Sequence, residues 1–178
     1  GVAAAYKVVS TGLRKFTSLV IDQVSEVDRL AKAGAKLGVA TQDMIGLGKA
    51  AQELSGVSPE QFGTALQRMT RRIAEAADGS GEAQKAIKEL GLDAQALQLA
   101  GPAESFRMIS TAIQGVENPA DRLRLAFKLF DSEGAALVTT LSAGREAIEG
   151  IEQKARDLGN TVSAFDAKSI EQMNDSLG

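Results

Sequence analysis

Acidic side chains at helical spacing are the first residues of this 178-residue chain that could do chemistry. Asp22 lies one helical turn before Glu26, and Glu146 one turn before Glu149, so each pair shares a helix face. Paired carboxylates can hold two metal ions in a helical bundle, but such centres also take histidine from Glu-x-x-His motifs. The chain has no His. We therefore interpret both pairs as solvated helix faces.

Glu104 is the carboxylate whose neighbours suggest catalysis. A glutamate can act as a general acid where an apolar pocket raises its pKa. Glu104-Ser105-Phe106 resembles the Glu-Ser segment of lytic transglycosylases, but the Gly-Leu-Met-Gln-like and Ala-Tyr-Asn-like segments of that family are missing. The simpler interpretation is an acid favoured by the dipole of a helix N-terminus. We expect no catalytic residue, and peptidoglycan cleavage through Glu104 is kept as an alternative.

Cofactor and metal motifs are incomplete. Without His or Cys, the usual nucleophile–base pairs and zinc sites are excluded. The run Gly46-Leu47-Gly48-Lys49-Ala50 is similar to part of a phosphate-binding loop, but the first glycine and the hydroxyl are replaced by Asp43 and Ala50. Residues 78–82 lack the spaced ligands of a calcium loop. We expect no cofactor, no metal and no small-molecule substrate.

Charge and hydropathy narrow the possible partners further. The net charge of −3 argues against a general nucleic-acid binder. No uncharged run approaches the ~18 residues of a membrane span, so we expect no membrane contact from this segment. Two basic clusters have acids beside them, and we interpret them as solvated faces; they are Arg68, Arg71 and Arg72, and Arg122, Arg124 and Lys128.

The elements that position these residues are all predicted helices. Glycines at 38, 56 and 91 are typical of residues that end an α-helix in the left-handed backbone conformation. Ser58-Pro59 and Asn118-Pro119 are typical of helix starts. The sequence therefore predicts an all-α fold with a long amphipathic helix over residues 1–37 and a compact bundle of about seven to nine short helices over 38–178. The short helices are expected at 41–54, 58–77, 82–90, 101–114, 118–130, 132–141, 145–158 and from 163 onward, with a brief turn after Asp93.

Residues 2–37 carry a heptad pattern with weak positions at Gln23 and Gly34. This seam packs either on its own domain or against another copy, and both alternatives stay open. Its candidate partner-binding residues are Leu13, Phe16, Val20, Val27 and Leu30. In the bundle, the predicted buried residues are Phe62, Leu66, Met69, Ile73 and Ala76 in one helix, and Leu123, Phe127 and Phe130 in another.

From about Leu30 to Gly178 the chain resembles the tail tape measure proteins of tailed bacteriophages and related minor tail proteins. The order and spacing of several short segments carry this resemblance. They are residues 37–41, 51–60, 65–69, 81–86 with 90–92, 118–122, 129–130 with 134–137, and 174–175. One departure is Phe130-Asp131-Ser132-Glu133-Gly134, where the family often reads Phe-Gly-Arg/Lys-x-Gly.

The resemblance implies a structural role in the virion, in the tail lumen or at the tail tip, with assembly in the host cytoplasm. It implies a part in setting tail length and in genome ejection. It also implies self-association, expected as a homo-oligomer and specifically a trimer, and contacts with tail tube proteins, tail tip proteins and tail assembly chaperones. No catalytic residue carries over. We expect the chain to be a piece of a longer polypeptide, and a helical scaffold from outside phages is a further alternative.

Overall fold

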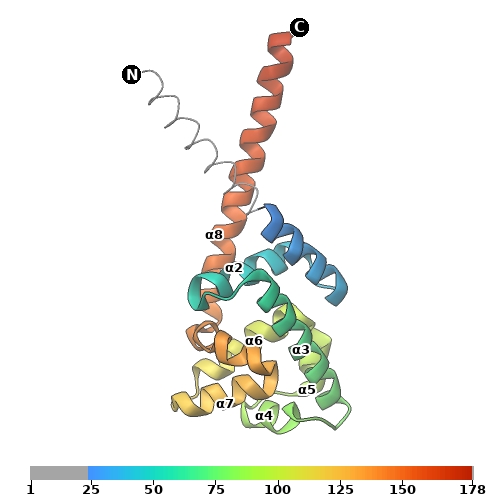
Figure 1. Ribbon diagram of the computed structural model, residues 1–178, viewed down its shortest axis with the longest axis vertical. Helices are drawn as coiled ribbons and strands as arrows, with labels where there is room; N and C mark the ends of the chain where they lie inside the picture. Colours follow the sequence, from blue (N-terminus) through green and yellow to red (C-terminus); the bar gives the residue numbers. More distant parts are fainter. Residues whose placement is uncertain (1–23, 178) are drawn as a thin grey trace, which may run out of the picture.

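The computed structural model describes residues 24–177, with side chains through residue 160. These residues are helical with no strand, which confirms the all-α prediction for this part of the chain (Figure 1). A first helix covers residues 24–37. It is followed by α2 (Thr41–Ser55), α3 (Pro59–Ala77), α4 (Ala83–Glu89), α5 (Ala94–Ala100), α6 (Pro102–Gln114), α7 (Pro119–Phe130) and α8 (Ser132–Leu177).

Most of the predicted helix boundaries are confirmed by their caps. The Ser58 hydroxyl accepts a hydrogen bond from the Gln61 amide, and the Gln61 side chain accepts one from the Ser58 amide. Pro59 fills the first helical position, where its missing N–H leaves no bond unmade. Asp93 and Asn118 cap α5 and α7 through their side chains.

The predicted cap at Thr41 is wrong. Ala40 occupies the N-cap position of α2 without a side-chain hydrogen bond, and Thr41 is the first helical residue. The glycine stops on either side of α2 are as predicted, because Gly38 and Gly56 have φ of 68° and 67°.

The longest described helix is α8, so the prediction of a long N-terminal helix followed only by short ones is wrong. A kink at Gly144 (φ 84°) divides α8, and the helix then continues through the breaks expected near residues 158–163. At Gly144 a Cβ would lie 2.3 Å from the Gln114 side-chain oxygen. At Gly159 a Cβ would have nothing within 4 Å. A glycine in a helix costs only about 1 kcal/mol, so Gly159 does not by itself end α8.

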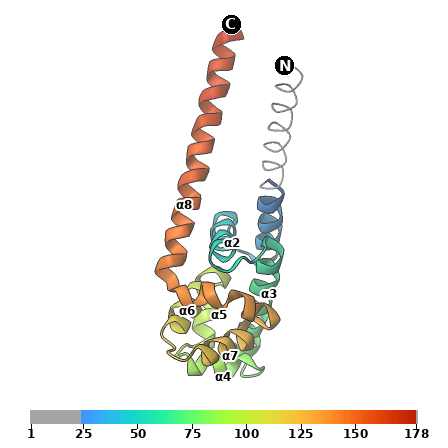
Figure 2. The same ribbon diagram turned by 60° about the vertical axis from the view of Figure 1, so that its left-hand side comes forward.

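The bundle covers less of the chain than expected. Figures 1 and 2 show α3 to α7 gathered at one end of the molecule while the C-terminal part of α8 projects away from them. The region 38–178 is therefore a helical bundle with a projecting helix, and not a compact module throughout. The separate domain boundary between residues 37 and 38 stays a prediction.

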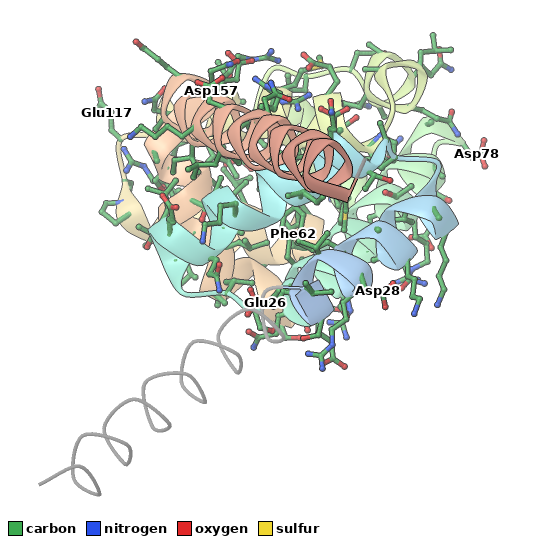
Figure 3. The ribbon with its side chains drawn as sticks, turned by 90° about the horizontal axis from the view of Figure 1, so that it is seen from above. Glu26, Asp28, Phe62, Asp78, Glu117 and Asp157 are labelled. Carbon is green, nitrogen blue, oxygen red and sulfur yellow. The ribbon has the colours of Figure 1, made fainter. Side chains whose placement is uncertain are left out.

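Three phenylalanines form the centre of the core. Phe106 makes edge-to-face contacts with Phe62 and Phe130, with ring centroids 5.5 and 5.8 Å apart. Figure 3 shows Phe62 in the middle of the bundle. The stripe predicted in α3 is buried throughout, but Leu123 and Phe127 of α7 are about half exposed. The α7 side chains that face the core are Phe130, as predicted, together with Leu125, Ala126 and Leu129.

Glycines let α2 pack closely against two neighbouring helices. A Cβ on Gly48 would lie 2.7 Å from the Leu30 Cδ2 atom, and one on Gly46 would lie 3.0 Å from the Glu152 Cγ atom. The segment that is similar to a phosphate-binding loop is thus inside a helix, where its glycines allow close approach. This packing fixes α2 between helix 24–37 and α8.

Candidate functional site

The base of the projecting helix is held by a cluster of charged residues from three helices, here called the α8 mount. Its centre is Arg107 of α6, which donates hydrogen bonds to Glu152 of α8 and to Asp43 of α2. The Arg107 Nε–Glu152 Oε2 and Arg107 Nη2–Glu152 Oε1 distances are 3.1 and 2.5 Å, and the Nη2–Asp43 Oδ1 distance is 2.8 Å. One guanidinium therefore ties α8 to both α2 and α6.

The side chains at the centre of the α8 mount are almost fully shielded from solvent. Only 1% of the Glu152 side chain and 12% of the Arg107 side chain are exposed. The hydrogen bond to Glu152 raises the pKa of Arg107 above its ordinary value; burial opposes this rise, and the bond to Asp43 adds to it. A buried carboxylate without its partner would carry a large desolvation cost. The arrangement therefore favours α8 docked on the bundle.

The rim of the mount contains the suspected catalytic acid. Glu104 forms ion pairs with Arg145 and, at 3.5 Å, with Arg107. Arg145 also pairs with Glu149 at 3.1 Å. The hydrogen bond to Glu104 is the main cause of the raised pKa of Arg145, with burial acting in the opposite sense. The Glu104 side chain is 40% exposed between two cations, unlike the apolar pocket that a general acid of this type needs.

Sequence reasoning missed Arg107 and Glu152, the two residues at the centre of this site. One signal was present, because Glu152 follows the buried Ile148 by one helical turn and so lies on the apolar face of α8. An acid on such a face needs a buried cation as partner. The partner could not be named, since Arg107 is 45 residues away in sequence.

The predicted partner seam is only partly described. Leu13, Phe16 and Val20 lie outside the described residues. Val27 is exposed, whereas Leu30 is buried against α2 in the core of its own chain. Its contribution to a partner interface stays a prediction.

The basic cluster of α3 is a solvated face only in part, because Arg71 is exposed whereas Arg72 is buried. Arg72 is buried and donates hydrogen bonds to the Phe127 and Lys128 carbonyl oxygens at the end of α7. It also pairs with Asp131 at 3.1 Å. Arg68 pairs with Glu133 at 2.5 Å. These arginines hold the α7–α8 turn, while Arg71 pairs with Glu75 within its own helix.

The side chains of the second basic cluster are also paired, while Arg124 and Lys128 stay exposed as predicted. Arg124 forms ion pairs with Glu89 and Asp121, and Lys128 forms one with Glu82. Arg122 donates to the Val116 carbonyl oxygen at 2.5 Å. Each of these contacts ties α7 to a neighbouring segment or completes a turn of the chain. Neither cluster therefore offers a set of unpaired cations to a nucleic acid.

The acidic pairs noted in the sequence lie apart from any metal-binding arrangement in the described side chains. Glu146 is exposed, Glu149 pairs with Arg145, and Asp22 lies outside the described residues. Among the side chains described, those of residues 24–160, no group of three or more acidic residues is arranged to hold a metal ion. In residues 24–177, no helix combines the length and apolar character needed to cross a bilayer.

A protein-family model matches most of the chain. Residues 2–131 match the model described as "Phage-related minor tail protein". This chain belongs to the phage-related minor tail protein family. Neither the curated proteins nor the solved structures contain a match.

Membership confirms the family-level resemblance and implies a component of the virion tail. The matched region of this minor tail protein ends at Asp131, where α7 gives way to α8. The bundle helices α2 to α7 thus lie inside the family match, and the projecting helix lies beyond it.

Proposed function

We propose that this minor tail protein is a non-enzymatic structural module of a tail tape measure protein. Two observations together support this proposal. The chain matches the family model, and the charged cluster of the helical bundle holds the base of one long helix. In this proposal the module lies in the tail lumen or at the tail tip, after assembly in the host cytoplasm. It takes part in tail assembly and genome ejection.

The proposed partners are further copies of the chain, in the trimer that the resemblance implies, together with tail tube proteins, tail tip proteins and tail assembly chaperones. The base of α8 packs on α2 and α6, and the rest of the helix projects away from the bundle (Figure 2). A projecting helix of this kind supports a protein-binding role. The proposal includes no small-molecule substrate, cofactor or membrane contact.

The folded-back bundle also supports a role other than a linear ruler. A helix rises 1.5 Å per residue, so a ruler of this many residues would extend roughly 270 Å. Here helices α3 to α7 lie side by side and add little length (Figure 1). The proposed contribution is therefore a folded body at a fixed place in the tail.

Electron microscopy of tails tests this function. Residues 24–178 would be deleted in frame from the phage gene that encodes them. We expect tails of normal length that fail to infect, because the module acts in tip assembly or ejection. Tails shortened in proportion to the deletion would make the segment part of the ruler. Full infectivity would contradict a tail role for the module.

A further inference from the structure

The helix α8 consists of two halves that meet at Gly144. Residues 132–143 form its lower half and residues 145–177 its upper half. Gly144 has φ of 84° and ψ of 172°, a backbone region that is essentially restricted to glycine. Gln114 of α6 donates a hydrogen bond to the Ala143 carbonyl oxygen at 3.0 Å, which satisfies one carbonyl at the end of the lower half. The two halves are therefore distinct helical segments joined at one glycine.

Uncharged contacts hold the lower half on the bundle. Its side chains Leu137 and Leu141 are fully buried. The Ser110 hydroxyl donates a hydrogen bond to the Leu141 carbonyl oxygen at 2.9 Å. The Ser55 hydroxyl accepts one from the Thr140 amide at 3.0 Å. Separating these contacts exposes apolar surface to water, which is the main cost of taking a packed helix apart. The lower half should therefore leave its neighbours only when the bundle unfolds.

The upper half is held mainly by charged contacts. Among residues 145–160, only Ile148 and Glu152 are buried. Glu152 contacts α6 through its two hydrogen bonds with Arg107. Separating this pair lets water hydrate both charges, and this hydration returns the desolvation cost that a buried pair carries. The upper half is thus attached by little apolar surface and by a contact whose loss water largely compensates.

The other charges of the α8 mount do not favour renewed docking. The groups that meet at the mount are Asp43 of α2, Glu104 and Arg107 of α6, and Arg145, Glu149 and Glu152 of α8. Each side of the contact therefore carries two carboxylates and one guanidinium. After separation both sides have the same net sign, so their long-range attraction is absent. Docking depends on the short-range bonds between the two sides.

We propose that Gly144 is a hinge and that the Arg107–Glu152 pair is its latch. The upper half releases from α2 and α6 as an intact helix, while the lower half stays packed. In the released state Gly144 takes helical dihedral angles, which glycine can adopt, and α8 becomes one continuous helix. At 1.5 Å per residue the upper half is roughly 50 Å long. A change at one residue therefore displaces the far end of α8 over a large distance (Figure 2).

This device goes beyond the proposed function, because it is a motion within one chain. Measurements on the purified chain in solution test the hinge, whereas microscopy of tails tests the function. Either can fail without the other.

Thiol labelling of the full chain tests release, because the chain has no cysteine of its own. Ile148→Cys places a thiol at a fully buried position of the upper half, and Leu137→Cys is its matched control in the lower half. A chromogenic disulfide reagent reaches either thiol only when that half of α8 leaves the bundle. Urea unfolding of each variant, followed by circular dichroism, corrects the labelling rates for differences in global stability.

We expect the thiol of Ile148→Cys to react at least about tenfold faster than that of Leu137→Cys. Its rate should also depend less on urea, because release exposes less surface than global unfolding. Equal corrected rates with the same urea dependence would overturn the hinge, since α8 would then leave only with the whole bundle.

Two further substitutions separate the latch from a general loss of stability. Glu152→Gln removes a contact that exists only in the docked state, so it should speed labelling of Ile148→Cys by about tenfold or more. Ser55→Ala removes the contact with Thr140, which the released state keeps. It should speed labelling of Leu137→Cys and leave that of Ile148→Cys unchanged. Faster labelling of Ile148→Cys in both cases would contradict separate release, and no effect of Glu152→Gln would contradict the latch.

Pairs of spin labels test whether the upper half moves as an intact helix. Gln42→Cys on α2 and Lys154→Cys on the upper half form one pair at exposed positions. The control pair joins Glu53→Cys on α2 to Thr139→Cys on the lower half, which are also exposed. In the unmodified background, both pairs should give mainly one short distance.

Gly144→Ala should then drive release. Alanine is strained at φ 84°, and its Cβ would lie 2.3 Å from the Gln114 side-chain oxygen. We expect the pair at residues 42 and 154 to shift to one longer, well-defined distance, while the control pair keeps its distance. A broad distribution would indicate local unfolding, and an unchanged distance would indicate no hinge; either result would overturn the proposal. Should Gly144→Ala not fold, the thiol comparison decides, because it retains Gly144.

Discussion

Arg107 and Glu152 form a side-on ion pair in which two guanidinium nitrogens meet both carboxylate oxygens, at 3.1 and 2.5 Å. The pair joins α6 to α8 at the point where α8 begins to leave the bundle (Figure 2). The stability of the projecting helix thus depends on a contact that lies at its base.

Removing the charge of only one member of the Arg107–Glu152 pair should strongly lower the free energy of unfolding. Glu152→Gln leaves the buried Arg107 without its main counter-charge, and we expect a loss of about 3–5 kcal/mol in the free energy of unfolding. The double variant Arg107→Met/Glu152→Leu removes both charges and should recover most of that loss. Urea unfolding followed by circular dichroism measures both. Additive losses in the double variant would show that the two residues do not act as a pair.

Replacing a helical glycine by alanine should change the free energy of unfolding in opposite directions at two positions. Gly48→Ala forces Leu30 to move, since the new Cβ would lie 2.7 Å from its Cδ2 atom. We expect destabilisation of about 1–3 kcal/mol, the range for overpacking. Gly150→Ala meets open space within α8 and should stabilise by about 0.5–1 kcal/mol. Thermal unfolding of the two variants compares them; a gain at position 48 would contradict the close approach.

Asp131 should be replaced more easily by glycine than by alanine. Asp131 has φ of 62° and ψ of −142°, a region favoured by glycine. Both variants lose the ion pair with Arg72, but only glycine relieves the backbone strain. We therefore expect Asp131→Gly to be about 1–3 kcal/mol more stable than Asp131→Ala in chemical denaturation. Equal stabilities would mean that the backbone relaxes at no cost.

Glu104→Gln should leave the chain folded and change no peptidoglycan activity. Its ion pairs with Arg145 and Arg107 are partly exposed, so the loss should be at most about 1 kcal/mol. A zymogram on peptidoglycan should show no clearing by either form. Clearing by the wild type that the variant loses would support the alternative in which Glu104 is a catalytic acid.

The contact between α4 and α7 should depend on pH. The hydrogen bond from Arg124 lowers the pKa of Glu89 below its ordinary value of 4.5. A lowered carboxylate pKa stabilises the folded state above the unfolded pKa, and this contribution is lost as the pH falls through the folded value. Wild type should therefore exceed Glu89→Gln in stability at pH 6, and the difference should shrink as the pH falls below 4.5. Melting temperatures across this range test the sign, and a gap that widens in acid would contradict it.

The sequence alone determined the helical class and most helix boundaries, because caps such as Ser58 with Pro59 and stops such as Gly56 act through neighbouring backbone groups. It also determined the buried stripe of α3, since that stripe depends on helical periodicity. These signals are local, so they are present in any chain with the same residues in the same order. The family resemblance draws on the same short segments.

Tertiary structure decided what those local signals leave open. Gly144 kinks α8 where Gln114 packs so closely that a Cβ would lie 2.3 Å from its side-chain oxygen, whereas Gly159 remains helical with nothing within 4 Å of a Cβ. Arg72 is buried rather than solvated because the end of α7 lies over it. The Arg107–Glu152 pair joins residues on separate helices, and only folding brings their charges together. Burial and long-range charge pairing depend on which helices become neighbours, a choice that no single helix specifies.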